Sequence, residues 1–206
     1  MKLNGININP IAQRWKERYA AQSDNVKAKL DHLKERNPND YQLKVIKKSK
    51  VEPMEGDLFV LSPIKNMYFY GKVHKANIQH ASNDVFIHGK SVIFIFRHVT
   101  EEISANSFNE DYKNLLIEPA IVDSSYWKKG YFFTVSNHKS SDKEISLDYG
   151  FYKISNGKYY TEEGIELERT PELLGTYGVS TITGIASKVW KELIIDPNLS
   201  KMVDKE

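Results

Sequence analysis

Gly56-Asp57-Leu58-Phe59-Val60-Leu61 and Met67-Tyr68-Phe69-Tyr70-Gly71-Lys72-Val73 are the two stretches that decide the fold of this chain. Successive side chains of an extended strand point to opposite faces, so the second stretch has one apolar face and one aromatic, polar face. Residues 63–66 between them begin with proline and end with asparagine, which is typical of a turn. The pattern therefore predicts a hairpin that opens a β-rich domain.

Further strands are predicted after this hairpin, at residues 84–88, 91–97, 115–117 and 131–135. Residues 92–96 are apolar at every position, which favours a central strand that is covered on both faces. Asn156-Gly157 separates two short strand-like stretches, and this pair suits a two-residue type I′ turn because both positions must reach positive φ. A second hairpin is expected there.

Helices are predicted at both ends of the chain. Apolar residues recur at helical spacing between Pro10 and Asn37, and Ser23 can cap a second helix, so we expect a helical hairpin or one kinked helix. Thr170-Pro171-Glu172 resembles the start of a helix that Gly175 and Gly178 would stop after about a turn. From Thr181, a further helix is predicted that ends before Asp196-Pro197, with one apolar face formed by Ile182, Ile185, Ala186, Val189 and Leu193. The tail from Asn198 to Glu206 is expected to fray.

The fold class predicted from these patterns is α+β and β-rich. We expect a bent antiparallel sheet or small barrel, with an N-terminal helical appendage and a C-terminal helix packed on the sheet. The domain boundary is placed near Val51, which gives a basic helical appendage at residues 1–50 and a β-rich domain at residues 51–206.

Charge divides the chain at the same place. Residues 1–50 hold 12 Lys or Arg and 5 Asp or Glu, a net charge of +7, which leaves −5 for residues 51–206. Such a split marks either a basic arm for nucleic acid or an acidic partner, or a helix with a solvated lysine face. The chain has no cysteine, no signal-peptide pattern and no membrane-length apolar run, so a cytoplasmic protein without a membrane partner is expected.

The opening hairpin resembles the immunity protein 26 family of bacteria. The resemblance rests on Gly56-Asp57, an aromatic and aliphatic strand, Tyr70-Gly71-Lys72-Val73, and Trp127 ahead of Gly130 and a further aromatic strand. It covers roughly residues 51–190, and residues 1–50 lie outside it. The family occurs beside polymorphic toxins, so the resemblance implies a mostly β protein that binds and neutralises a toxin.

Catalytic and cofactor motifs are absent from the sequence. The six histidines fit no metal-ligand spacing, so no metal and no cofactor are expected. There is no G-x-S-x-G elbow, no cysteine nucleophile, and neither a dinucleotide nor a Walker glycine pattern. Adjacent carboxylates such as Glu162-Glu163 usually diverge and serve solubility. A non-enzymatic protein is therefore predicted.

A binding surface remains, and two acidic stretches are its first candidates. Residues 101–118 hold five acids and one lysine, and residues 162–172 hold five acids and one arginine. Carboxylates presented to the basic cleft of a nuclease would steer association and compete with nucleic acid, although such stretches are also ordinary solvated loops. The predicted partner-binding residues are Asp57, Tyr70, Glu101, Glu102, Glu110, Asp111, Trp127, Glu162 and Glu163.

Two of these residues have a second interpretation. Asp57 after Gly56 can simply accept hydrogen bonds from backbone amides in a turn, and Trp127 can pack in the core instead of anchoring a partner. The rival function is a nucleic-acid-binding module, in which residues 1–50 contact phosphates and Tyr68, Tyr70 or Tyr152 stack on bases.

Overall fold

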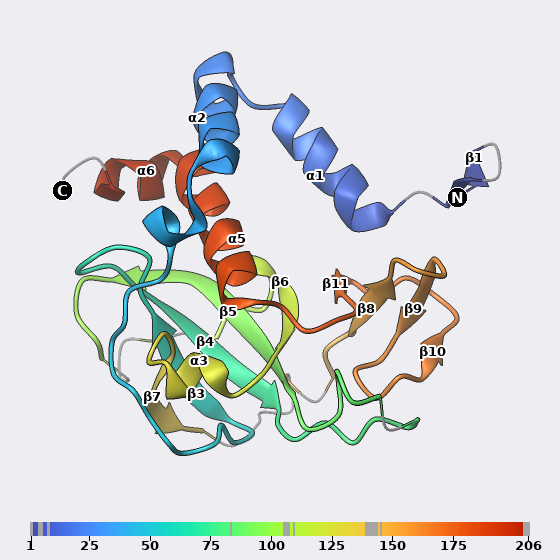
Figure 1. The fold of residues 1–206 in the computed structure, drawn as a ribbon. Helices are drawn as coiled ribbons and strands as arrows, with labels where there is room; N and C mark the ends of the chain where they lie inside the picture. Colours follow the sequence, from blue (N-terminus) through green and yellow to red (C-terminus); the bar gives the residue numbers. More distant parts are fainter. Residues whose placement is uncertain are drawn as a thin grey trace.

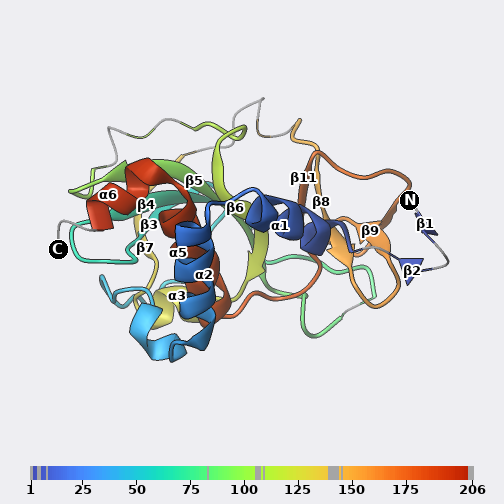
Figure 2. The same cartoon turned by 90° about the horizontal axis from the view of Figure 1, so that it is seen from above.

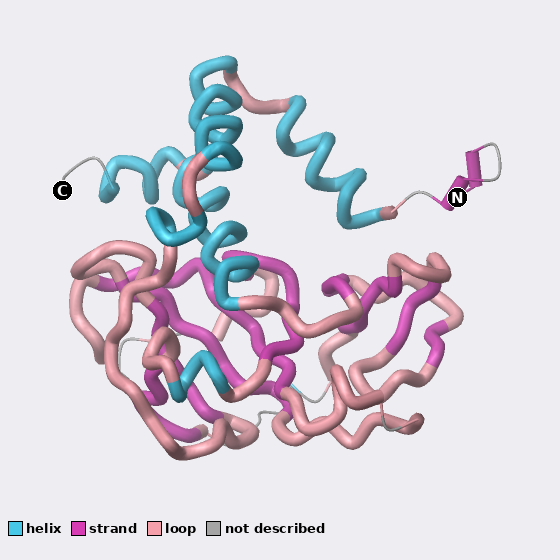
Figure 3. The backbone as a smooth tube through the Cα atoms, viewed as in Figure 1, coloured by secondary structure: helices cyan, strands magenta, loops and turns pink. Residues whose placement is uncertain are grey.

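A computed structural model describes residues 2–3, 6–7, 9–82, 84–104, 108, 110–138, 144 and 146–203. Two β-sheets lie side by side, and the main helices stand on one side of them (Figures 1 and 3). The prediction of a β-rich α+β fold with helices at both ends is confirmed. The strands described form no closed barrel, so the barrel alternative is wrong for this part of the chain.

The larger sheet is antiparallel and has the strand order β6-β5-β4-β3-β7. Its strands are β3 (Asp57–Leu61), β4 (Tyr68–Lys75), β5 (Ser91–Thr100), β6 (Leu115–Val122) and β7 (Phe133–Asn137). The predicted opening hairpin is β3 and β4, paired from Leu58 opposite Lys72 to Leu61 opposite Phe69. Register shifts in the β4–β5 and β5–β6 pairs bend the sheet.

The smaller sheet has the order β10-β9-β8-β11. Its strands are β8 (Tyr149–Lys153), β9 (Lys158–Tyr160), β10 (Glu166–Leu167) and β11 (Leu173–Thr176), and β11 runs parallel to β8. Near the N-terminus, β1 (Lys2–Leu3) pairs with β2 (Ile6–Asn7).

Edge strands of the two sheets meet at a seam. The amide of Ser180 donates to the carbonyl of Ile121 at 2.7 Å, and Ile121 forms a parallel bridge with Val179. A Cβ on Gly175 of β11 would lie 2.2 Å from the carbonyl oxygen of Pro119 in β6. Pro119 lies within β6, and an edge strand tolerates a proline because the missing N–H has no sheet partner to lose.

The helices are α1 (Pro10–Ala20), α2 (Asp24–Glu35), the 3-10 turn η1 (Pro38–Tyr41), α3 (Ser125–Lys128), α5 (Ile182–Ile195) and α6 (Pro197–Val203). The helical hairpin before Asn37 and the helix predicted from Thr181 are confirmed, and Ser23 caps α2 as its sequence position predicts. The Thr181 side chain caps α5 by accepting from the amide of Gly184. Apolar residues of α5 pack on the larger sheet together with Leu33 and Leu43 of the N-terminal segment.

Four local predictions are wrong. Residues 84–88 form turns and not a strand, residues 173–176 form β11 where a helix start was expected, and residues 197–203 form α6 where fraying was expected. The second hairpin exists, but Lys153 pairs with Lys158 across a four-residue loop, and of Asn156 and Gly157 only the glycine has positive φ. Leu199 of α6 is buried in the main core, which explains why the tail is helical.

Candidate partner-binding site

Asp57 and Trp127, far apart in sequence, lie in one hydrogen-bonded network. The indole Nε1 of Trp127 donates to Thr134 Oγ1 at 3.0 Å, and that hydroxyl donates to Asp57 Oδ2 at 3.5 Å. The Asp57 carboxylate also accepts from the Met54 amide at 3.0 Å and from Asn137 Nδ2 at 2.8 Å. Both residues therefore join the start of β3 to β7 and α3.

Packing around this network leaves neither side chain at the surface. Trp127 is 1% exposed and contacts the rings of Phe59 and Phe132, with centroids 5.4 Å and 5.2 Å away. Gly130 has a φ of +85°, and a Cβ there would lie 2.9 Å from the Lys47 carbonyl carbon. These contacts fit the second interpretation given for each residue: Asp57 accepts hydrogen bonds at a turn, and Trp127 packs in the core.

Charged residues lie beneath the polar face of β4. Lys72 is 1% exposed, and its Nζ donates to Glu110 Oε1 at 2.8 Å and to Glu144 Oε2 at 2.7 Å. His74 Nδ1 lies 3.3 Å from Glu144 Oε1, and Phe94 and Tyr149 pack edge-on against the imidazole. The face predicted to be polar is thus covered by paired charges and aromatic rings.

The ionisation of this cluster follows from its hydrogen bonds. Burial alone would raise the pKa of Glu144, but hydrogen bonds from His74 and Lys72 outweigh it and lower the pKa to about 2. Burial alone would lower the pKa of Lys72, but its bonds to the two carboxylates leave that pKa raised. The cluster is an ion-paired group that holds its charges.

The predicted binding residues are distributed over the molecule. Tyr70 is fully buried, and its hydroxyl donates to the Ser104 carbonyl at 2.9 Å. Glu110 is engaged by Lys72, and Glu162 is 7% exposed. Among the predicted binding residues, Glu101, Glu102, Asp111 and Glu163 have exposed carboxylates.

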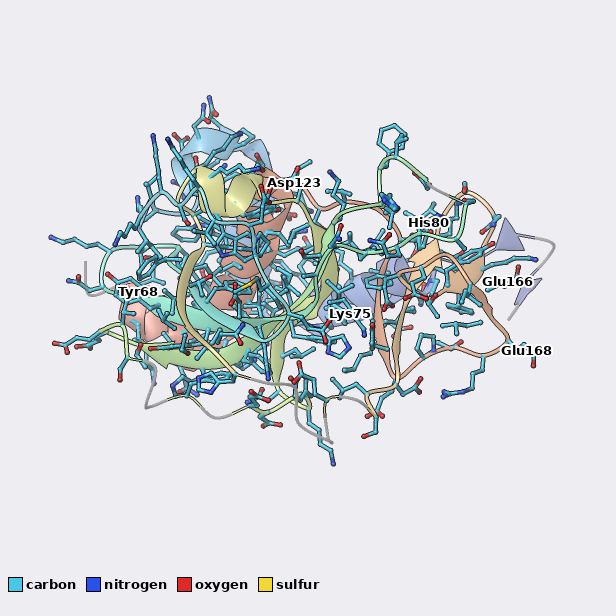
Figure 4. All side chains as sticks on the ribbon, turned by 90° about the horizontal axis from the view of Figure 1, so that it is seen from below. Tyr68, Lys75, His80, Asp123, Glu166 and Glu168 are labelled. Carbon is cyan, nitrogen blue, oxygen red and sulfur yellow. The ribbon has the colours of Figure 1, made fainter. Side chains whose placement is uncertain are left out.

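The first acidic stretch begins far from the second but ends beside it, because Tyr112, Lys113 and Glu118 line the same groove as Glu172. Thr100, which precedes Glu101, pairs with Tyr68, and Figure 4 places Tyr68 at one end of the molecule. Glu166 and Glu168 lie at the opposite end beside His80, with Lys75 between the two ends (Figure 4). A partner that covers Glu166 and Glu168 would therefore leave Glu101 and Glu102 uncovered.

We call the end that carries the second stretch the end face: the smaller sheet, residues 161–172, and the described part of the loop 77–90. Residues 148–177 hold six carboxylates and three cations. Two of those cations are paired, Lys158 with Glu166 at 2.8 Å and Arg169 with Asp148 at 2.6 Å. Glu163, Glu168 and Glu172 are exposed, so the end face presents net negative charge.

Aromatic rings line the end face. Tyr160 and Tyr177 lie with centroids 5.3 Å apart, and Lys153 Nζ lies over both rings. Burial first, and the nearby carboxylate of Glu162 second, raise the pKa of Tyr149 behind them. Acidic and aromatic groups are therefore combined on this face, which is the chemistry that was expected of a partner-binding surface.

His80 and the loop around it were missed in the sequence. Its Nδ1 accepts from the amides of Ser82 at 3.2 Å and Asp84 at 3.3 Å, so Nε2 is the nitrogen that donates to Tyr177 Oη, 2.6 Å away. The amide of Ala81 donates to the Glu163 carbonyl at 2.8 Å. A histidine followed by small polar residues was the available signal, but Glu163 and Tyr177, which hold the loop in place, lie 80 to 100 residues later in the chain.

A groove of about 510 Å³ lies between α1, α5 and the seam of the two sheets. The Arg18 guanidinium holds Glu192 through two bonds of 2.8 and 2.9 Å, and Arg97 bonds the same carboxylate at 2.6 Å. Arg14 donates to the Leu174 carbonyl at 2.9 Å. Viewed from above, α1 crosses over β6 towards β11 (Figure 2). Two arginines of the basic segment are thus engaged within the protein.

Within the described part of the chain, no group of three or more His, Asp or Glu side chains is arranged to hold a metal ion. No described helix has the length and apolar character that a membrane span requires. A family model described as Immunity protein 26 matches residues 54–161, slightly more than half of the 206 residues. No curated protein and no solved structure matches the chain.

Proposed function

The chain belongs to the immunity protein 26 family, and on that premise we propose that it binds a cognate bacterial toxin and neutralises it by binding alone. Membership of the family implies an immunity protein directed against a toxin. The matched region runs from the start of β3 to the end of β9, so it contains the larger sheet and half of the smaller one.

Carboxylates on the end face support a basic target. Glu163, Glu168 and Glu172 are exposed and lie on or beside a sheet that also carries Tyr160 and Tyr177. Negative charge accelerates association with a positively charged partner, and aromatic side chains supply much of the binding energy in protein interfaces. We propose this face as the toxin-binding surface, which includes Glu162 and Glu163 of the predicted set.

A nuclease is the target that this charge suits best. A nuclease carries a basic cleft for its phosphate substrate, and an acidic face that enters the cleft excludes nucleic acid from it. The toxin would then be inhibited at a one-to-one ratio, and its inhibition would weaken as salt screens the charges.

Co-purification is the first test. The tagged full-length protein is captured from its native host in low and moderate salt, and retained proteins are identified by mass spectrometry. We expect a single toxin-like protein in near-equal amount, whose expression kills cells unless this protein is present. Equal killing with and without this protein would refute the proposed function.

Charge-neutral variants locate the face. Glu163→Gln, Glu168→Gln and Glu172→Gln together should lower the association rate about tenfold or more at low salt and flatten its salt dependence. The matched control removes three exposed carboxylates from the N-terminal helices, by Glu17→Gln, Asp24→Asn and Glu35→Gln. A third variant, Glu101→Gln, Glu102→Gln and Asp111→Asn, tests the other acidic stretch, and an effect confined to it would move the interface there.

A further inference from the structure

Val85 and Phe86 are the most exposed large apolar residues described, at 79% and 75%. They are adjacent at the tip of the loop 77–90, inside the region matched by the family. Single exposed apolar residues are common, but a neighbouring pair of this exposure on a protein that binds another protein is typical of an anchor. Both residues lie on the end face, but neither contributes to the negative charge from which that face was proposed above.

The two ends of the loop 77–90 are hydrogen-bonded to each other. The amide of Ile78 donates to the Lys90 carbonyl at 2.9 Å, and the amide of Gly89 donates back to the Ile78 carbonyl at 2.9 Å. Ile78 and Ile87 are 3% and 2% exposed and belong to the core cluster that contains Phe94 and Phe151. The loop therefore has buried apolar residues on both sides of its exposed tip.

Local hydrogen bonds also hold the tip. Asp84 accepts the Phe86 amide on its carboxylate at 3.0 Å, and its carbonyl accepts the amides of Ile87 and His88. His80 binds the Asp84 amide on one side and Tyr177 on the other. A side chain presented on a pre-organised backbone loses less conformational entropy on binding than one on a loose loop.

Charge indicates what kind of pocket the tip fits. The Ala81 amide bonds the Glu163 carbonyl at 2.8 Å, which joins the loop to the acidic stretch, and a Cβ on Gly164 would lie 2.4 Å from the His80 ring. The surface beside the tip therefore carries exposed carboxylates. A complementary partner would offer an apolar pocket with basic residues at its rim.

We propose that Val85 and Phe86 are the hydrophobic anchor of this protein and insert into an apolar pocket, rimmed by basic residues, on the cognate toxin. This inference rests on the proposed function and assigns its binding energy to a particular pair of residues. Carboxylates of the end face steer the encounter, and the loop tip slows dissociation.

The test compares toxin binding by three full-length proteins: the wild type, Val85→Ser/Phe86→Ser, and the control Val51→Ser/Met54→Ser. The control pair is exposed by 68% and 57% on a different segment. All three should unfold at similar temperatures because the changed side chains make little contact with the core. We expect the loop variant to bind the captured toxin at least about 30-fold more weakly, mainly through faster dissociation, and the control within about threefold of the wild type.

Each outcome decides something different. A wild-type protein that retains no toxin refutes the proposed function and the anchor with it. Toxin that binds the wild type and the loop variant equally refutes the anchor alone and leaves the function standing. A loss in both serine variants would show general sensitivity to lost apolar surface and would also overturn the anchor.

Discussion

At the residue scale, the most consequential group is the buried carboxylate of Glu144. It accepts from Lys72 and His74 beneath β4, where no water-exposed surface can compensate for its loss. We expect Glu144→Gln to destabilise the fold by about 3 kcal/mol, because it leaves the buried ammonium of Lys72 with Glu110 alone. Urea denaturation at pH 7 measures this. The control, Glu166→Gln, breaks the surface pair with Lys158 and should leave the stability nearly unchanged, because solvent screens an exposed pair.

The lowered pKa of Glu144 also predicts how the stability of the fold depends on pH. Its pKa is lowered from 4.5 to about 2 in the folded protein. A carboxyl group with a depressed folded-state pKa stabilises the fold fully above its unfolded pKa, and that contribution disappears as the pH falls through the folded value. The stability difference between wild type and Glu144→Gln should therefore be constant above pH 5 and shrink between pH 4.5 and 2. Denaturation curves with an unchanged difference at pH 3 would contradict this.

Sequence patterns identified residues better than they identified roles. Gly56, Asp57, Trp127 and Gly130 were singled out in the sequence, and their side chains and backbone lie together where β3, β7 and α3 meet. A sequence reveals that a residue type is unusual for its position, whereas its exposure depends on strands that arrive from elsewhere in the chain. Val85 and Phe86 were hidden for the same reason, since a stretch of apolar residues resembles a buried strand.

At the element scale, the seam between the sheets depends on Gly175. Its neighbour across the seam is the backbone oxygen of Pro119, which cannot move away as a flexible side chain would. Gly175→Ala should therefore separate β11 from β6 and lower stability by about 2 kcal/mol or more. Thr176→Ala, on the same strand but without added volume, is the control. Thermal unfolding measures both, and equal melting temperatures would contradict the close approach.

Helix α1 should be the least stable of the long helices. None of its residues is buried, and it is attached through Arg14, through Arg18 to Glu192, and by Lys191 lying 4.5 Å from the centre of the Trp15 ring. We expect Arg18→Ala to raise amide hydrogen exchange in α1 at least about fivefold while α5 is unaffected. Lys16→Ala, exposed on the same helix, is the control. Faster exchange in α5 as well would show that the helices open together.

Elements were predictable where one local pattern dominated. The opening hairpin and α5 have clear periodicity and strong end signals, so their bounds were correct to within about two residues. The helix predicted to start at residues 170–172 was wrong because the segment that follows, β11, pairs in parallel with β8, a contact that no local pattern encodes. The loop at Asn156-Gly157 was predicted to have two residues and has four, because the register of β8 and β9 is fixed by their packing and not by these two residues.

At the scale of the whole molecule, the positive charge of the N-terminal segment lies in two regions, residues 42–50 and helix α1, which are attached to the rest of the protein in different ways. Residues 42–50 run extended along the larger sheet, with the amides of Lys44, Ile46 and Ser49 bonded to carbonyls of the core at 2.7, 2.7 and 3.0 Å. Their lysine side chains are exposed, whereas Arg14 and Arg18 are engaged in the groove below α1. The basic segment therefore offers fewer free cations than its net charge of +7 suggests, and its end is integrated with the β domain.

Binding to nucleic acid should consequently be weak and confined to low salt. If four exposed lysines contact a single strand, the affinity falls about 50-fold between 50 and 200 mM salt, because each neutralised phosphate adds about 0.7 to the salt slope. Fluorescence anisotropy with a labelled oligonucleotide measures this for the full chain, for a variant with glutamine at Lys44, Lys47, Lys48 and Lys50, and for a control with glutamine at Lys65, Lys113, Lys158 and Lys201. We expect only the first variant to abolish the low-salt binding. Tight binding that persists at 200 mM salt would instead make the N-terminal segment a nucleic-acid site, because screened surface lysines alone cannot sustain it.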